Sequence, residues 1–179
     1  MDTKKSLAWE EKSPFILAGL VLIFFLAKLV ALPIPLFHDE LEVYGKALFY
    51  MLDNGPSMIP GDVDPDISRG HPLFFIFFVS SLTAIFGKTY VAARAIILLI
   101  SLALIVTTYY LGKELVNKKV GIWAALFLAI QPMFFAQSTL ILPEVMLSLL
   151  GSLTILFYLK NRYGWYFLFG SLQAAAVMQ

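Results

Sequence analysis

The sequence contains no cysteine and has few charged residues. Without cysteine the chain can form neither disulfide bonds nor thiolate metal sites. Charged residues make up 14% of the 179 residues and hydrophobic residues 60%, whereas a soluble domain typically has about 25% charged residues. The net charge of +1 gives no basic excess with which to bind nucleic acid. Together with a mean hydropathy of +0.82, this composition predicts an integral membrane protein made of helices.

Long hydrophobic runs mark the predicted membrane spans. The first run, residues 14–36, contains 23 residues and would be about 34 Å long as a helix, enough to cross a hydrocarbon core about 30 Å thick. Later runs predict spans at 91–111, 120–136 and 145–159, and a fifth that begins at 163–179. Because the fifth run reaches Gln179 without a polar flank, we expect residues 1–179 to be a single transmembrane module, the N-terminal part of a longer protein.

The apolar segment at 72–86 decides the predicted topology. Its 15 residues would reach only about 22 Å as a helix, so it is either a short span or a helix in the membrane interface. If it does not cross, the basic residues of the N-terminus, of the stretch 112–119 and of the 160–162 turn all lie on one face, as the positive-inside rule requires. We therefore predict a cytoplasmic N-terminus and an external loop at 37–90, which shares its face with the turn at 141–144.

Two adjacent acids, Asp39 and Glu40, open this external loop. Asp39 is followed three residues later by Glu42, a pattern that resembles a capping box. Asp39 is therefore interpreted either as a helix cap or as a catalytic carboxylate held at the start of a helix. The predicted sidedness lets both acids converge with Glu144, which is far away in the sequence. The apolar positions of one helical stripe predict an amphipathic helix at 39–52 that lies along the membrane; they are Leu41, Tyr44, Leu48 and Met51.

Further along the chain, basic residues flank the 72–86 segment: Arg69 and His71 before it, and Arg94 after it. Basic groups at a membrane surface commonly snorkel as anchors. The alternative is a clamp for a lipid-linked phosphate, which arginine suits through bidentate hydrogen bonds. Glu144, at the head of a span, is similarly either a helix-terminal anion or a functional acid. Three acids at 62–66 have calcium-loop spacing, but Ile67 stands where such a loop needs glycine, so a solvated loop is predicted.

The order of these motifs resembles the N-terminal module of the GT-C membrane glycosyltransferases. A first span is followed by HDE and VYGKAL, then by GHPLFFIFFVSSLTAIFG, by AAR at the head of a span and by an LPE turn. The similarity is to the protein O-mannosyltransferases that use dolichyl-phosphate mannose and to the lipid A aminoarabinose transferases, and it extends over about residues 14–160. It implies an all-α polytopic transmembrane helical bundle, with interfacial amphipathic helices at 39–52 and 72–86 in the first external loop.

The resemblance also implies an activity and roles for individual residues. A sugar would move, with inversion, from a polyprenyl-phosphate donor to a protein or lipid/glycan hydroxyl on the external face of a bacterial or archaeal cytoplasmic membrane. Asp39 and Glu40 would be catalytic, with Asp39 as the base, and Glu144 would orient the acceptor or bind a metal. A divalent cation, Mg or Mn, would be held by Asp39 and Glu144. The residues implied to bind the donor phosphate are Arg94, Arg69 and His71.

Two departures from the family pattern stand out: Glu144 replaces the aspartate common in relatives, and HPLF replaces a double-proline form. The alternative function is a non-enzymatic membrane protein, either part of a transporter or a lipid-binding scaffold. A transporter would place ionisable groups near the bilayer midplane, whereas the acids here lie at the ends of nearly uniformly apolar spans. That distribution favours an interfacial site. Because the family typically has more spans than this chain, we expect the module alone to be inactive.

Overall fold

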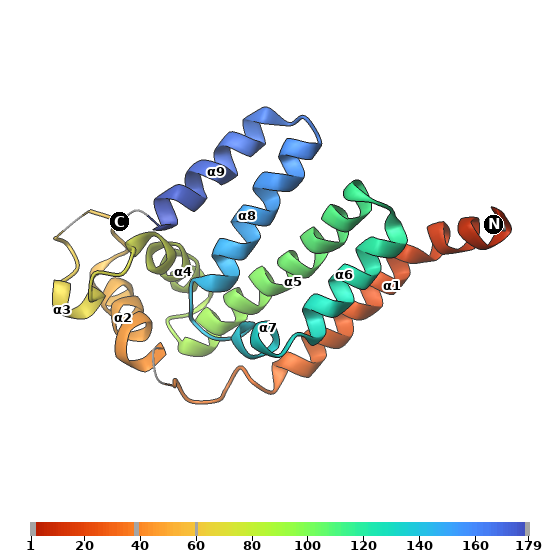
Figure 1. Ribbon diagram of the computed structural model, residues 1–179. Helices are drawn as coiled ribbons and strands as arrows, with labels where there is room; N and C mark the ends of the chain where they lie inside the picture. Colours follow the sequence, from red (N-terminus) through yellow and green to blue (C-terminus); the bar gives the residue numbers. More distant parts are fainter. Residues whose placement is uncertain (1–2, 38–39, 60, 178–179) are drawn as a thin grey trace.

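The computed structural model describes residues 3–37, 40–59 and 61–177, and within them the chain is helical and contains no strand (Figure 1). The elements are α1 (Thr3–Leu29), the π-helical turn η1 (Glu40–Tyr44), α2 (Gly45–Asn54), α3 (Pro65–Ser68), α4 (Leu73–Phe86), α5 (Tyr90–Leu115), α6 (Lys118–Ile130), α7 (Pro132–Gln137), α8 (Glu144–Leu159) and α9 (Tyr163–Val177). Two helices in the described part are long and apolar enough to cross a membrane, in the segments Lys12–Leu29 and Tyr90–Leu115. The predicted all-α membrane bundle is confirmed.

The helix α5 is at the centre of the bundle. After a tight turn α6 returns antiparallel to α5, α8 packs on another side of α5, and α9 folds back along α8 (Figure 1). The helix α1 lies against both α5 and α6. The turn between α5 and α6 is stabilised by Asn117, whose side chain accepts a hydrogen bond from the Val120 N–H at 3.0 Å and thereby caps α6.

Two glycines allow α5 and α6 to touch backbone to backbone. A Cβ atom added to Gly121 would lie 2.4 Å from the carbonyl oxygen of Tyr109, and one added to Gly112 would lie 2.8 Å from the Cα of Gly121. Small residues of this kind let membrane helices approach closely, because no side chain keeps their backbones apart. The spacing of the hairpin therefore depends on the absence of a side chain at these two positions.

Each end of the bundle brings together segments that are far apart in the sequence. One end, here called the loop end, holds residues 30–37, the start of α5, α7 and the turn 138–143 (Figure 1). There the Tyr90 hydroxyl donates to the carbonyl of Pro33 at 3.2 Å. At the opposite end the α5–α6 and α8–α9 turns approach each other, and Lys160 pairs with Glu114 at 3.3 Å. These two turns thus lie at the end of the bundle away from the loop end.

The helix α4 packs against α2 at the loop end. Just before α4, His71 Nδ1 lies 3.3 Å from the hydroxyl of Tyr44, and just after it Lys88 Nζ donates to the Leu52 carbonyl at 2.5 Å. Both ends of α4 are therefore next to η1 and α2. Its buried face includes Phe75 and other apolar side chains that join the main core.

Two helices end earlier than the hydrophobic runs suggest. The helix α1 ends at Leu29, and residues 30–36 continue as turns, because two prolines in this stretch have no N–H to donate. The run 120–136 is divided between α6 and α7 at Gln131, because Pro132 begins a new helix. The Gln131 side chain caps α7 by accepting from the Phe134 N–H at 2.5 Å.

The apolar stripe expected on the 39–52 helix differs at its first member. Tyr44, Leu48 and Met51 are buried as the stripe predicts, but Leu41 is 50% exposed. The reason is η1: a π-helical turn contains an extra residue, so the side chains before it rotate away from the face of the α-helix that follows. The same rotation turns Glu40 inward.

Candidate functional site

Glu40 and Arg94 form a buried ion pair at the loop end. Each side chain is only 1% exposed. Arg94 donates from Nε to Oε1 at 3.0 Å and from Nη2 to Oε2 at 2.5 Å, which is the two-bond geometry in which arginine matches a carboxylate. The pair joins the first residue of η1 to the second turn of α5.

The other hydrogen bonds of Arg94 hold the chain that follows α1. Nη1 donates to the carbonyls of Ala31 at 3.3 Å and Leu32 at 3.5 Å, and also to that of Ile34. Nη2 donates to the Pro35 carbonyl at 3.2 Å. All three guanidinium nitrogens thus have acceptors within the protein, and a phosphate would bond to Arg94 only by displacing one of them.

The carboxylate of Glu40 also binds two backbone N–H groups. Oε1 accepts from Ile141 at 2.9 Å and Oε2 accepts from Phe37 at 3.4 Å. One side chain therefore connects the end of the first span, the start of α5 and the turn before α8. Because Ile141 is three residues before Glu144, the Glu40 carboxylate also fixes the position of the head of α8.

Gly45 makes the turn at Glu40 possible. A Cβ atom at Gly45 would lie 2.1 Å from the carbonyl oxygen of Glu40, far closer than two non-bonded atoms can approach. Only glycine leaves room for the backbone to close in the π-helical turn. The glycine in the sequence VYGKAL thus places Glu40 beneath the surface.

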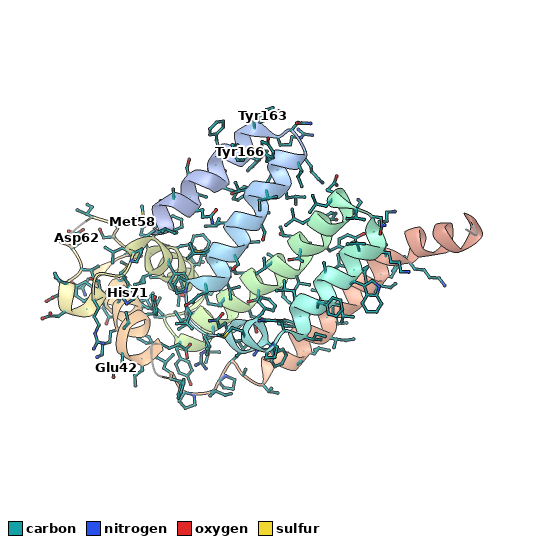
Figure 2. The ribbon with its side chains drawn as sticks, viewed as in Figure 1. Glu42, Met58, Asp62, His71, Tyr163 and Tyr166 are labelled. Carbon is teal, nitrogen blue, oxygen red and sulfur yellow. The ribbon has the colours of Figure 1, made fainter. Side chains whose placement is uncertain are left out.

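Arg69 and His71 belong to a second, more exposed polar group beside α2 (Figure 2). Arg69 pairs with Glu42 at 3.4 Å, and the side chains of both are about half exposed. Glu42 also pairs with Lys46 at 3.1 Å. His71 contacts the ring of Tyr44, with 5.1 Å between ring centroids. The structure therefore separates the three expected phosphate-binding residues, with Arg94 buried on Glu40 and the other two at this group.

The acids at 62–66 take part in local turns. Asp62 accepts from the Ser57 hydroxyl at 2.5 Å, and Asp64 accepts from the Asp66 N–H at 2.9 Å, which caps α3. In the described part of the chain, no group of three or more His, Cys, Asp or Glu side chains is placed to hold a metal ion. Asp39, the expected base and metal ligand, lies outside the described residues.

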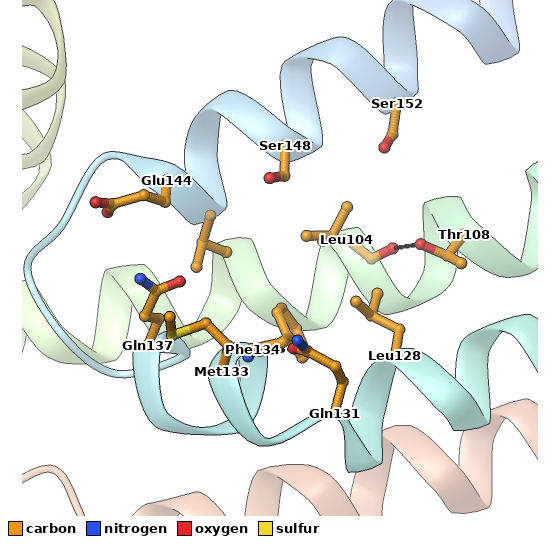
Figure 3. A pocket seen from close by; sticks show the side chains of 11 residues that line it. Leu104, Thr108, Leu128, Gln131, Met133, Phe134, Gln137, Glu144, Ser148 and Ser152 are labelled. Atoms are coloured by element: carbon orange, nitrogen blue, oxygen red, sulfur yellow. Dashed lines mark hydrogen bonds between the residues drawn. The ribbon is translucent and has the colours of Figure 1, made fainter.

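Glu144 is exposed at the first residue of α8, where it opens a groove that the sequence analysis did not identify. The groove has a volume of about 380 Å³ and lies between α6–α7 and α8, with α5 as its floor (Figure 3). Its polar lining residues are Thr108, Gln131, Gln137, Glu144, Ser148 and Ser152. The signal in the sequence was the spacing of Glu144, Ser148 and Ser152, because positions four residues apart share one face of a helix.

Lys28 connects α1 to α7 inside the bundle. Its Nζ donates to the Phe135 carbonyl at 2.7 Å and lies 4.4 Å from the centroid of the Phe135 ring. A charge within an apolar span is costly unless it faces protein partners, and this lysine is 5% exposed with both contacts provided by one residue. Lys28 thereby links the last turn of α1 to α7, which is part of the loop end.

The fold and this centre define a polytopic helical membrane protein with a buried ion pair at one end of the bundle. Residues 70–179 match the family described as dolichyl-phosphate-mannose-protein mannosyltransferase. The chain belongs to this family, and it is therefore a membrane glycosyltransferase of the GT-C type. No curated protein and no solved structure gives a significant match.

Family membership confirms the resemblance inferred from the order of the motifs, and it favours a glycosyltransferase over a transporter or a scaffold. The matched region includes His71, Arg94 and Glu144 but begins after Asp39 and Glu40. The roles of the individual residues therefore have to be argued from the geometry.

Proposed function

We propose that this chain supplies part of the active site of an enzyme that transfers a sugar from a polyprenyl-phosphate donor to a hydroxyl group of a protein, lipid or glycan. The observation that carries the proposal is the buried Glu40–Arg94 pair, with the Ile141 N–H bound to the same carboxylate. This arrangement brings Glu40 and the turn before the head of α8 to one place. A single-displacement transfer needs such a fixed position for the acid that receives the acceptor proton.

In this proposal the loop end faces the outside of a cytoplasmic membrane, and the N-terminus is cytoplasmic. What supports this is the position of basic residues at the opposite end: Lys113 and the lysines that begin α6, together with the pair Lys160 and Arg162 in the α8–α9 turn. Cytoplasmic loops carry such an excess of lysine and arginine. The helix α4 does not cross the membrane in this arrangement, and its 14 residues would reach only about 21 Å against a hydrocarbon core of about 30 Å.

Asp39 acts as the base because it directly precedes the anchored Glu40. The acceptor hydroxyl oxygen forms a bond to the anomeric carbon while the bond from that carbon to the phosphate oxygen breaks on the opposite face, which inverts the configuration. The hydroxyl proton passes to the Asp39 carboxylate, and the lipid phosphate leaves with the electron pair. Glu40 contributes as a structural anchor, since both its oxygens already accept hydrogen bonds.

Arg69 and His71 bind the donor phosphate in this proposal. Both lie in the more exposed polar group beside α2, and about half of the Arg69 side chain is accessible. Arg94 acts through Glu40, because its N–H groups are bound to protein acceptors. Positive groups beside the phosphate would stabilise the charge that grows on it as the sugar departs.

The proposal also includes a divalent cation bound by carboxylates. Mg²⁺ is commonly bound through one or two carboxylates together with phosphate oxygens. Asp39 and Glu144 are the candidates, because Glu144 is exposed whereas the oxygens of Glu40 are occupied. When bound, the cation would neutralise charge on the phosphate.

The test is Asp39→Asn in the full-length protein, assayed with a polyprenyl-phosphate sugar. We expect transfer to fall by about 10²–10⁴-fold, because the acceptor proton loses its base, while expression and membrane insertion stay normal. The matched control is Asp53→Asn, since Asp53 is an exposed acid at the end of α2, away from the proposed centre, and we expect full activity. Near-normal turnover of Asp39→Asn would remove Asp39 from the role of base.

A further inference from the structure

The serines of α8 that line the groove differ from several other hydroxyl residues of the bundle. Ser101, Thr107, Thr108 and Thr154 each donate to the carbonyl four residues earlier in their own helix, at 2.8 to 2.9 Å. Such a bond satisfies a hydroxyl inside an apolar helix. Among the described residues, Ser148 and Ser152 make no hydrogen bond of this kind, and both line the groove. Their hydroxyls remain available to water or to a ligand.

Glu144 lies on the same face of α8 as these two serines (Figure 3). Figure 3 shows Glu144, Ser148 and Ser152 in order along α8, above Leu104 and Thr108 of α5 and opposite the amides of α6–α7. Neither Glu144 nor Gln137 has a hydrogen bond or ion pair to another side chain in the part of the chain that the structure describes. A carboxylate and polar groups left open along a membrane helix are costly in hydrocarbon, which indicates water or a polar ligand in the groove.

The chemistry of the lining selects the ligand. None of the eleven lining residues is basic, and Lys28, which contacts α7, is held by the Phe135 carbonyl. A phosphate in the groove would meet the Glu144 carboxylate and no positive charge, and like charges repel. A hydroxyl or an ammonium group would instead donate to the carboxylate and exchange hydrogen bonds with the serines.

We propose that the groove between α7 and α8 is a water-filled binding site for an uncharged or cationic hydrogen-bond-donating group and that, with no divalent cation on Glu144, it rejects phosphate. The shared chemistry is that of a sugar hydroxyl or an amine. Only the identification of this group with a part of the transferase substrate rests on the proposed function.

Single cysteines in the full-length protein test the groove, because Ser148→Cys and Ser152→Cys preserve side-chain size and the 179 residues contain no cysteine. Each variant, with any cysteine beyond these residues replaced, is treated with methanethiosulfonates that carry a trimethylammonium, a hydroxyethyl or a sulfonate group. Rates are divided by those of a free thiol in solution. We expect the first two reagents to modify both cysteines and the anionic reagent to react about tenfold more slowly, from repulsion by Glu144.

Three comparisons make the result decisive. Glu144→Gln should raise the relative rate of the anionic reagent to that of the hydroxyethyl reagent. Leu26→Cys should not react with the charged reagents, because Leu26 is 54% exposed on α1 at one turn from the loop end and would face lipid. The cationic reagent should react faster than the hydroxyethyl reagent, because the carboxylate that repels an anion attracts an amine.

The proposal is overturned if none of the reagents modifies Ser148→Cys and Ser152→Cys, or if the anionic reagent reacts as fast as the others. The measurement needs no turnover. A failed Asp39 test would therefore leave the groove result standing, and a closed groove would leave the transfer proposal standing.

Discussion

Replacement of Arg94 by methionine is expected to destabilise the folded protein by about 3–5 kcal/mol, because it leaves the Glu40 carboxylate buried without a counter-charge. The guanidinium also binds four carbonyls after α1, so the loop end should loosen. Thermal unfolding of the purified protein in detergent measures the loss. The double variant Arg94→Met/Glu40→Gln should lose less than the single variant, because no uncompensated charge remains.

The matched control is the exposed pair of Arg69 and Glu42, whose side chains are about half exposed. Arg69→Met should change stability by less than about 1 kcal/mol, as is usual for exposed ion pairs. If Arg94→Met were no more damaging than Arg69→Met, the buried pair would not be what holds the loop end together.

Gly121→Ala is expected to have the next largest effect on stability. The added methyl group would meet the Tyr109 carbonyl oxygen at 2.4 Å and the Lys113 nitrogen at 3.1 Å. Both are backbone atoms, so relief requires α5 and α6 to separate. Overpacking of this kind costs about 1–3 kcal/mol, and sometimes more, and it should appear as a lower unfolding temperature.

Gly19→Ala is the corresponding control within α1. No atom lies within 4 Å of a Cβ at Gly19, and alanine favours a helix over glycine by about 1 kcal/mol. We expect this variant to be as stable as the original protein or slightly more stable. An equal loss in both variants would mean that the close approach of α5 and α6 is not the cause.

The general architecture was predictable because its signals are local. Hydrophobic runs and the proline after Gln131 are visible in the sequence, and the order of HDE, GHPL, AAR and LPE identified the family. The break at Pro132 could also have been predicted, since proline has no N–H. The end of α1 could not be predicted from the hydrophobic run alone. The structure shows that the helix stops at Leu29 and that the rest of the run, to residue 36, is not helical.

The centre itself could not be predicted from local patterns. Glu40 and Arg94 are 54 positions apart, and the sequence does not state that a π-helical turn rotates Glu40 inward. An ideal α-helical periodicity instead placed Leu41 on the buried stripe. The pairing depends on tertiary contacts with residues 31–35 and with Ile141, which no single stretch of sequence encodes.

The central claim is that the loop containing Glu40 and the turn before Glu144 share one face of the membrane because α4 does not cross it. Cysteines at Ile59 and Val116, which are 64% and 65% exposed, can be labelled in the full-length protein with a membrane-impermeant maleimide, before and after permeabilisation. We expect Ile59→Cys to label from outside and Val116→Cys only after permeabilisation. Labelling of both from the same face would mean that α4 spans the membrane and that the proposed site cannot assemble.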